Sequence, residues 1–221
     1  MTPEFLNGLN DQQKAAVTAE NGSVLVLAGA GSGKTRVLTT RIAWLLSIGK
    51  VSSQEILAVT FTNKAAKEML LRIGSMLPYN LRGMWVGTFH GLCNRMLRYH
   101  HEQAALPESF QILDMQDQLS SIKRLMKNLN VDTDKIVPRQ VQKFINSAKD
   151  EGLRPDNIDD PNGFNRDYIS LYEAYNSQCQ KEGVVDFGEL LLRSLELLRR
   201  SESIRKHYQS RFKHILVDEF Q

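Results

Sequence analysis

A glycine-rich stretch at residues 28–35, AGAGSGKT, carries the residue types that bind phosphate groups. It fits the phosphate-loop pattern G-x-x-x-x-G-K-[ST], except that Ala28 holds the first position. Glycines let backbone N–H groups turn toward phosphate oxygens, and the N-terminus of a following helix adds positive potential. Lys34 could reach the β- and γ-phosphates of a nucleotide, and Thr35 could place its hydroxyl on Mg²⁺. The predicted nucleotide contacts are Ala28, Gly29, Ala30, Gly31, Ser32, Gly33, Lys34 and Thr35.

Two adjacent carboxylates, Asp218 and Glu219, follow a short apolar run at residues 215–217. In phosphate-loop enzymes a second strand supplies an Asp that holds Mg²⁺ through water, and a neighbouring acid deprotonates the attacking water. An acidic strand end is weak evidence alone, because strand ends are often acidic for solubility. Combined with Lys34 and Thr35, the pair predicts Mg²⁺-dependent hydrolysis of a nucleotide. Lys34, Asp218 and Glu219 are then catalytic candidates, and Thr35 and Asp218 are metal candidates.

Alternating apolar runs and helical patterns predict the elements that position these residues. Short β-branched and Leu-rich runs indicate buried parallel strands at residues 23–28, 56–61 and 84–89. Helical spacing and capping residues indicate helices at residues 9–20, 34–48, 63–77 and about 90–103. A regular alternation of this kind predicts a doubly wound α/β sheet with parallel strands.

The pattern changes in the second half of the chain, where helical periodicity dominates and little strand is indicated. Helices are expected at residues 114–129, 138–149, 165–181, 187–200 and 202–211, and one final strand at 214–218. Lys34 and Asp218 lie 184 positions apart (218 − 34), far more than a bare nucleotide fold needs. We therefore expect an α/β domain at 1–108 with an all-helical insertion at 109–212, and a return strand at 213–221.

Composition excludes several classes of protein and gives a modest hint of a partner. The chain of 221 residues is 42% hydrophobic and 24% charged, as in an ordinary globular protein, and no apolar run approaches the roughly 20 residues needed to cross a bilayer. Cys93 and Cys179 stand far apart, which predicts neither a disulfide framework nor a zinc site. Residues 1–105 carry 11 Lys and Arg against 6 Asp and Glu, so a polyanion would favour this part. A cytoplasmic protein without a membrane partner is expected.

Five segments, in the order LNDQQKAAV, LAGAGSGKTR, AVTFTNKAAKEM, VGTFHGL and ILVDEFQ, resemble the UvrD/Rep-type DNA helicases of superfamily 1. The resemblance extends over essentially the whole chain. It implies a RecA-like ATP-binding domain with an inserted helical subdomain, as the N-terminal portion of a motor that moves 3′ to 5′ on single-stranded DNA. It also implies ATP and Mg²⁺, single-stranded DNA and single-strand/duplex junctions, possible repair proteins, a role in DNA repair or replication, and a bacterial cytoplasmic, nucleoid-associated location.

The resemblance assigns roles to three further residues around the nucleotide. Gln13 resembles the glutamine that recognises adenine, and Arg36 the arginine that lies beside the base. Gln221 resembles the glutamine that senses the γ-phosphate and couples it to DNA, which makes it a further catalytic candidate. Without the resemblance, Gln13 and Arg36 would be interpreted as solvated helix residues.

Two segments just past the strands at 56–61 and 84–89 are candidates for DNA contact. Phe61 could stack on a base, because every base offers a π-face. Thr62, Asn63 and Thr88 could bind backbone phosphates, and His90 could do either. From the residues alone, a core position for Phe61 and a capping role for His90 are equally good interpretations, and the resemblance favours single-stranded DNA.

Two other functions remain open at this point. One is a module that keeps the nucleotide fold without hydrolysis, and the other is a different phosphate-loop enzyme, such as a recombination nuclease–helicase subunit. If the resemblance holds, residues 1–221 lack the second RecA-like domain and its arginines. We therefore expect the chain on its own not to unwind DNA.

Overall fold

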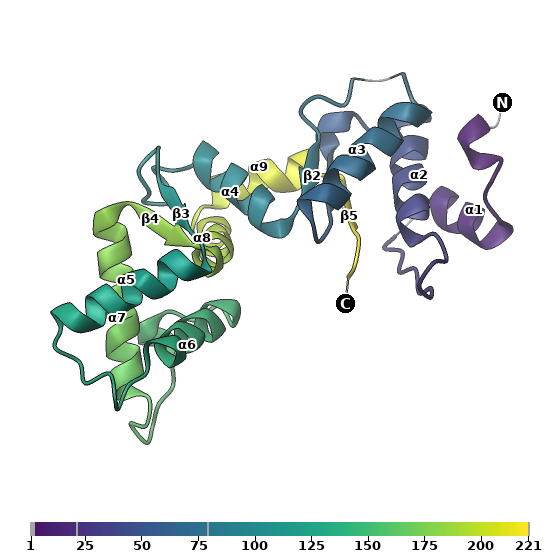
Figure 1. Ribbon diagram of the computed structural model, residues 1–221. Helices are drawn as coiled ribbons and strands as arrows, with labels where there is room; N and C mark the ends of the chain where they lie inside the picture. The colour runs from purple at the N-terminus through teal and green to yellow at the C-terminus, as the bar shows by residue number, and fades with distance from the viewer. Residues whose placement is uncertain (1–2, 21, 79, 221) are drawn as a thin grey trace. The chain divides into compact units, whose positions relative to one another are not determined.

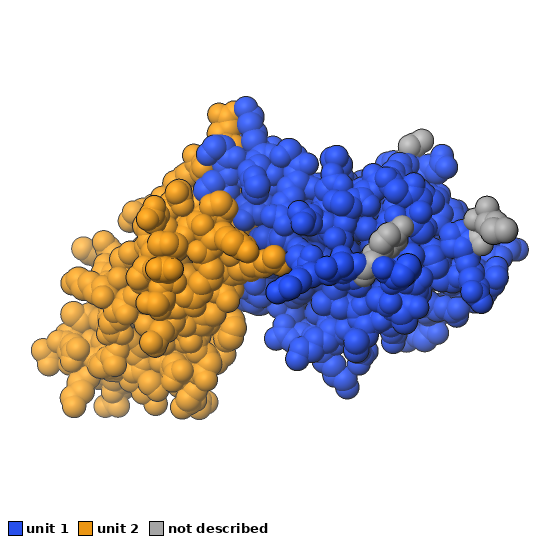
Figure 2. Space-filling model, turned by 90° about the horizontal axis from the view of Figure 1, so that it is seen from above, with its two compact units in different colours: residues 1–92, 203–221 blue, residues 93–202 orange. Residues whose placement is uncertain are grey.

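The computed structural model describes residues 3–20, 22–78 and 80–220. The chain divides into two compact units, coloured separately in Figure 2: a first unit of residues 1–92 and 203–221, and a second unit of residues 93–202. This division falls at 92/93 and 202/203, whereas the sequence pattern placed the subdomain limits at 108/109 and 212/213. The first unit is therefore discontinuous in sequence.

The first unit is built on a three-stranded parallel sheet in the order β2-β1-β5, of which Figure 1 labels β2 and β5. Its strands are β1 (Ile56–Val59), β2 (Trp85–Gly87) and β5 (His214–Val217). Ala58 of β1 lies opposite Val86 of β2 and Leu216 of β5. The predictions of strands near 56–61, 84–89 and 214–218 are confirmed, with shorter bounds.

The α-helices of the first unit form close to their predicted ranges, and short 3-10 helices (the elements labelled η) form where no helix was predicted. They are η1 (Glu4–Leu6), α1 (Asp11–Thr18), α2 (Lys34–Ser47), η2 (Ser53–Glu55), α3 (Asn63–Met76), the start of α4 (Phe89–Tyr99) and α9 (Glu202–Arg211). Ile42 and Leu45 of α2 and Met69 and Ile73 of α3 are fully buried in one core with Ile56 of β1. Figure 1 shows α1 beside α2, which contact each other.

The prediction of a buried strand at residues 23–28 is wrong. These residues form no strand, and their apolar side chains are exposed, from 40% at Val26 to 85% at Leu27. An apolar run becomes a buried strand only where a neighbouring strand supplies hydrogen bonds and helices cover its faces. Within the described ranges, no strand pairs with this segment, and the sheet consists of β2, β1 and β5 alone.

Both tryptophans of the chain, Trp44 and Trp85, belong to the first unit. Trp85 is 1% exposed and packs its indole edge-on against Tyr208 and Phe212, with ring centroids 5.6 and 5.3 Å away. The guanidinium of Arg211 lies 5.4 Å from the Trp85 ring. This aromatic cluster joins the end of α9 to β2, and it makes tryptophan fluorescence a reporter of the first unit.

The second unit is helical except for one short parallel strand pair, so the prediction of an all-helical insertion is wrong in this detail. Strands β3 (Gln111–Leu113) and β4 (Val184–Asp186) pair with Ile112 opposite Val185. Three-residue strands are too short to show an alternating pattern. Each strand leads directly into the N-cap of a helix, Asp114 or Asp186, so the sequence pattern at these positions predicts the start of a helix and not a strand.

The α-helices of the second unit form close to their predicted ranges, and a short 3-10 helix (labelled η) forms where none was predicted. They are α5 (Met115–Asn128), α6 (Pro138–Asp150), η3 (Pro155–Asn157), α7 (Arg166–Glu182) and α8 (Phe187–Arg200), with the second half of α4 before them. Ile122 and Met126 of α5, Ile145 of α6 and Tyr172 and Tyr175 of α7 are fully buried together. No helix among the described residues is long and apolar enough to span a membrane.

Candidate functional site

The glycine-rich loop leads directly into α2, which begins at Lys34. Gly31 and Gly33 have φ angles of +75° and +86°, in the left-handed region that favours glycine. Ser32 donates its hydroxyl to the Gly29 carbonyl oxygen at 2.7 Å, which tightens the turn. Two of the three loop glycines therefore adopt a conformation that favours glycine, at the positive end of a 14-residue helix.

Lys34 folds back over this loop. Its Nζ donates to the carbonyl oxygens of Ala28 at 3.0 Å and Gly29 at 3.1 Å. Both acceptors are neutral, and no salt bridge to Lys34 is found among the described residues. A phosphate oxygen would offer this ammonium group a stronger, charge-assisted hydrogen bond than either carbonyl.

Thr35 and Asp218 meet across most of the length of the chain. The Thr35 hydroxyl donates to Oδ2 of Asp218 at 3.3 Å, although the two residues are 183 positions apart in the sequence. Asp218 continues the pairing of β5 with β1, because its backbone N–H donates to the Val59 carbonyl oxygen at 2.8 Å. The carboxyl end of β5 thus delivers a carboxylate to the first turn of α2.

The donor atoms of Thr35 and Asp218 fit Mg²⁺, which prefers oxygen ligands and usually keeps phosphate and water among them. Within the described residues, no cluster of three or more His, Cys, Asp or Glu could hold a metal ion. A metal at this position would therefore rely on a phosphate and water for its remaining ligands, as Mg²⁺ does in nucleotide enzymes.

Glu219 adopts an uncommon backbone conformation. Its φ angle is +56°, in the left-handed region that few non-glycine residues occupy, and its side chain is exposed. Such conformations cluster at functional sites. The other residue predicted on this segment, Gln221, lies outside the described residues.

Gln13 lies against the glycine-rich loop. Its side chain closes a capping box with Asn10, accepting from the Asn10 N–H at 3.1 Å, and its Nε2 donates to the Ser32 carbonyl oxygen at 3.0 Å. Arg36 is close by: a Cβ atom added to Gly33 of the loop would lie 3.3 Å from Gln13 Nε2 and 3.9 Å from Arg36 Cβ. The structure thus brings both candidate base-contacting residues to the same loop.

Arg41 of α2 is a residue that sequence reasoning missed. Its Nη1 donates to three carbonyl oxygens at the end of α1, those of Ala16 at 3.1 Å, Val17 at 2.9 Å and Ala19 at 2.9 Å. Partial burial lowers the pKa of this guanidinium. The signal was present in the sequence: Arg41 lies four residues from both Val37 and Leu45, on the apolar stripe of the helix.

The candidate DNA-binding residues lie at the carboxyl ends of β1 and β2, the same sheet edge that carries Asp218. Phe61 is 82% exposed, so it is not a core aromatic. Thr62 caps α3 by accepting from the Ala65 N–H at 3.1 Å, and Asn63, the first residue of that helix, is exposed. Thr88 accepts from the Gly91 N–H at 3.1 Å, and His90 is exposed in the first turn of α4.

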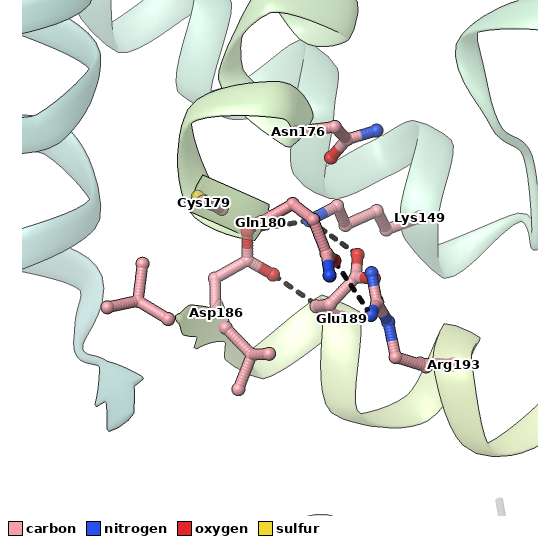
Figure 3. A pocket seen from close by; sticks show the side chains of 9 residues that line it. Lys149, Asn176, Cys179, Gln180, Asp186, Glu189 and Arg193 are labelled. Atoms are coloured by element: carbon pink, nitrogen blue, oxygen red, sulfur yellow. Dashed lines mark hydrogen bonds and ion pairs between the residues drawn. The ribbon is translucent and has the colours of Figure 1, made fainter. Parts of the chain in front are cut away.

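A buried ion cluster in the second unit is the main charged feature outside this site. Lys149 Nζ lies 2.7 Å from Asp186 Oδ2 and 3.0 Å from Glu189 Oε2, and Figure 3 shows its ammonium group reaching between the two carboxylates. Arg154 and Arg193 contact the other oxygen of Glu189 at 2.9 and 2.7 Å. The cluster borders a cavity of about 10 Å³, about the size of one water.

The ion cluster is strongly coupled. Burial alone would raise the pKa of Glu189, but Lys149, Arg154 and Arg193 outweigh it and lower that pKa below its ordinary value. Burial alone would lower the pKa of Lys149, but Glu189 and Asp186 raise it instead. Asp186 also accepts from the Tyr175 hydroxyl at 3.0 Å and caps α8 through the Glu189 N–H at 2.8 Å. These contacts hold α6, α7, β4 and α8 together, so the cluster is structural.

The parallel sheet, the glycine-rich loop at a helix N-terminus and the aspartate at a strand end define an α/β protein with a candidate phosphate site. The family is shown by sequence comparison. Residues 9–221 match the family described as UvrD/REP helicase N-terminal domain. The chain belongs to this helicase family, as the motif order in the sequence predicted.

Individual relatives agree with the family match. The chain is similar to DNA helicase II of Escherichia coli K12, with 54% identity over 98% of this chain and 30% of that protein. It is 53% identical to DNA helicase II of Haemophilus influenzae over 99% of this chain and 31% of that protein. It is 40% identical to the ATP-dependent DNA helicase PcrA of Bacillus subtilis over 99% of this chain and 30% of that protein. The chain thus spans about 30% of the length of these relatives.

Proposed function

We propose that this chain is the ATP-binding N-terminal part of an ATP-dependent DNA helicase that moves 3′ to 5′ along single-stranded DNA. The observation that carries the proposal is the contact between Thr35 and Asp218, 3.3 Å long and formed beside Lys34. It joins the glycine-rich loop to the acidic strand end that a phosphate-loop enzyme needs. Membership of the helicase family supports the same conclusion.

The residues around the loop divide the work on ATP. The backbone of 28–35 surrounds the phosphates, and Lys34 exchanges its two carbonyl partners for phosphate oxygens. Mg²⁺, when bound, neutralises phosphate charge, and Thr35 and Asp218 are the residues that would hold it. Glu219 accepts the proton of the attacking water. Gln13 and Arg36 contact the base, and Gln221 senses the γ-phosphate.

The exposed edge of the sheet is the proposed path of single-stranded DNA. Phe61 stacks on a base, and Thr62, Asn63 and Thr88 contact backbone phosphates, with His90 beside them. These side chains follow β1 and β2, while Asp218 follows β5, the other neighbour of β1. A structural change around the ATP phosphates can therefore be transmitted to the residues that contact DNA, because both sets of residues follow adjacent strands.

The wider setting of the proposal follows the family. The first unit corresponds to a RecA-like domain and the second to its inserted helical subdomain. The working protein acts at single-strand/duplex junctions in DNA repair or replication, in the bacterial cytoplasm near the nucleoid, where repair proteins are its possible partners. We expect residues 1–221 alone not to unwind DNA. In phosphoryl transfer, an arginine supplied by a second domain raises the rate about 10³- to 10⁵-fold.

The test uses a full-length helicase that carries this sequence, with Asp218→Asn compared with Asp134→Asn, an exposed loop residue of the second unit. We expect Asp218→Asn to reduce single-strand-stimulated ATP hydrolysis on the order of 10²- to 10³-fold, and Asp134→Asn to leave it unchanged. The unaltered enzyme should unwind a duplex with a 3′ single-stranded tail and not one with a 5′ tail.

Two results would contradict the proposal. Nucleotide binding without DNA-stimulated hydrolysis in the full-length protein would favour a non-hydrolysing module. Full activity of Asp218→Asn would remove the assignment of the site.

A further inference from the structure

Helix α1 carries Gln13 but has little to hold it in place by itself. It has eight residues, and isolated helices of that length are marginal in water. Its Val17 is fully buried against Val37 of α2, with Phe5 and Trp44 packed around them. Apolar burial is non-directional, so this contact keeps α1 on α2 without fixing how far it slides or turns there.

Directional contacts hold α1 at both ends. At its N-terminus, Gln13 Nε2 donates to Ser32 of the glycine-rich loop at 3.0 Å. At its C-terminus, Arg41 Nη1 donates to the carbonyl oxygens of Ala16, Val17 and Ala19. The last carbonyls of a helix have no partner within the helix, and a cation there also complements the helix dipole.

We propose that Arg41 is a positioning residue for recognition of the nucleotide base. It fixes the C-terminal end of α1 on α2, and since α2 begins at the glycine-rich loop, this sets where Gln13 stands relative to that loop. Arg41 lies two turns along α2 from the loop and acts on Gln13 through α1. The inference rests on the proposed function, in which Gln13 contacts the base.

The geometry separates this role from simple support of the fold. The loop that surrounds the phosphates is joined to α2 covalently and is closed by its own contacts, such as Ser32 to Gly29 at 2.7 Å. Losing Arg41 therefore leaves the phosphate contacts in place and frees only the helix that carries Gln13. Recognition of the base should weaken while affinity for a triphosphate without a base should not.

The experiment measures displacement of a fluorescent ATP analogue from the 221-residue chain in the presence of Mg²⁺. ATP and inorganic tripolyphosphate are the two competitors. The variants are Arg41→Gln and Arg41→Lys. The matched control is Lys50→Gln, which removes a nearby cation whose Nζ donates, among the described residues, to the Glu20 carbonyl oxygen at 3.4 Å, outside α1.

We expect Arg41→Gln to weaken ATP binding by roughly 5- to 10-fold, the lower range for coupling between separate sites. Tripolyphosphate binding should stay unchanged, and Arg41→Lys should fall between Arg41→Gln and the unaltered chain, because lysine restores the charge without the planar guanidinium. Lys50→Gln should match the unaltered chain with both competitors. Amide hydrogen exchange in α1 should accelerate in Arg41→Gln and not in Lys50→Gln.

Parallel losses of ATP and tripolyphosphate binding would mean that Arg41 only supports the fold, which would overturn the proposal. Unchanged ATP binding in Arg41→Gln would also overturn it. If Arg41→Gln does not fold, Arg41→Lys decides in its place: a selective loss for ATP supports the role, and a parallel loss overturns it. Failure of the proposed function looks different. The unaltered chain would then bind neither competitor, or Gln13→Ala would keep full preference for ATP, and either result also removes the basis for the role of Arg41.

Discussion

Two lysines, one in each unit, differ in their burial and in the charge of the groups that they contact. Lys34 in the first unit is only half-buried and donates to two neutral backbone oxygens. Lys149 in the second unit is 4% exposed and contacts two carboxylates at 2.7 and 3.0 Å. A buried charge without a partner is strongly destabilising, so the second lysine must be paired for the unit to fold. The first can be left weakly satisfied because water reaches it.

The contrast helps to distinguish a functional charge from a structural one. The ion cluster around Lys149 is complete without any ligand, and its nearby cavity has room for about one water. The glycine-rich loop has neutral acceptors around Lys34, and the oxygens of Thr35 and Asp218 lie beside it, 3.3 Å apart. A group whose contacts a phosphate would improve is the better candidate for binding one.

The largest expected effect is on activity, through Lys34→Ala in a full-length helicase that carries this sequence. We expect loss of ATP hydrolysis and unwinding on the order of 10³-fold, because the phosphates lose a charge-assisted donor. The melting temperature of the variant should stay close to that of the unaltered protein, since only two hydrogen bonds to exposed carbonyls are lost. An active Lys34→Ala enzyme, or one that no longer folds, would break the contrast between the two lysines.

The next effect is on stability, through Lys149→Met in the 221-residue chain. Removing this cation leaves Asp186 and Glu189 buried with one partner fewer, which should cost about 3–5 kcal/mol. Native-state hydrogen exchange should show this loss at amides of α6 and α8 and not at β1, because the partners of Lys149 all lie in the second unit.

Lys143→Met is the matched control for this variant, because Lys143 is exposed on the same helix. It should change the exchange free energies by no more than about 0.5 kcal/mol. Equal effects of the two substitutions would show that the ion cluster does not stabilise the unit.

The smallest expected effect is the loss of stability of the two units at low pH. The pKa of Glu55 in the first unit is lowered to about 2, mainly by its hydrogen bond with Lys213, and the pKa of Glu189 is also lowered from 4.5. A carboxylate with a lowered folded pKa adds stability that is present above its unfolded pKa. That stability is lost as pH falls below about 4.5 toward the folded value. Both units should therefore weaken on acidification, the second more strongly because Glu189 is buried.

Tryptophan fluorescence follows the first unit in this titration, since both tryptophans lie there, and hydrogen exchange at α8 follows the second. Glu55→Gln should flatten the fluorescence-detected change between about pH 5 and 2.5. Glu68→Gln, at an exposed position on α3, should not. Earlier acid unfolding of the first unit than of the second would contradict the expected order.

The α-helices of both units and most strands of the first unit were predictable because local signals determine them. Thr62 and Asp114 cap α3 and α5 through hydrogen bonds to residues no more than three positions away, and apolar spacing marks the buried faces. The strand at 23–28 failed because a strand depends on a neighbour as well as on its own residues. Its apolar pattern cannot show whether that neighbour is there.

Long-range polar contacts were the part that the sequence could not provide. Lys149 and Asp186 are 37 positions apart, and each looks like an ordinary surface charge in its own segment. The candidate phosphate site could be located from the sequence, because the spacing of AGAGSGKT and the Asp-Glu pair at 218–219 each point to phosphate chemistry. Their meeting at 3.3 Å is a tertiary fact that no local pattern contains.

The discontinuous first unit also has a consequence for synthesis on the ribosome. β1 cannot acquire β5 as a neighbour until residues 93–202 have been made, because β5 begins at His214. At about 5–20 residues per second, translation of the second unit takes roughly 5 to 20 seconds. During this interval the second unit can fold, because its residues are contiguous in the chain. β1 can pair with β2 but does not yet have β5 on its other side. Chaperones that bind nascent chains would therefore meet the unit that carries the glycine-rich loop in its least complete form.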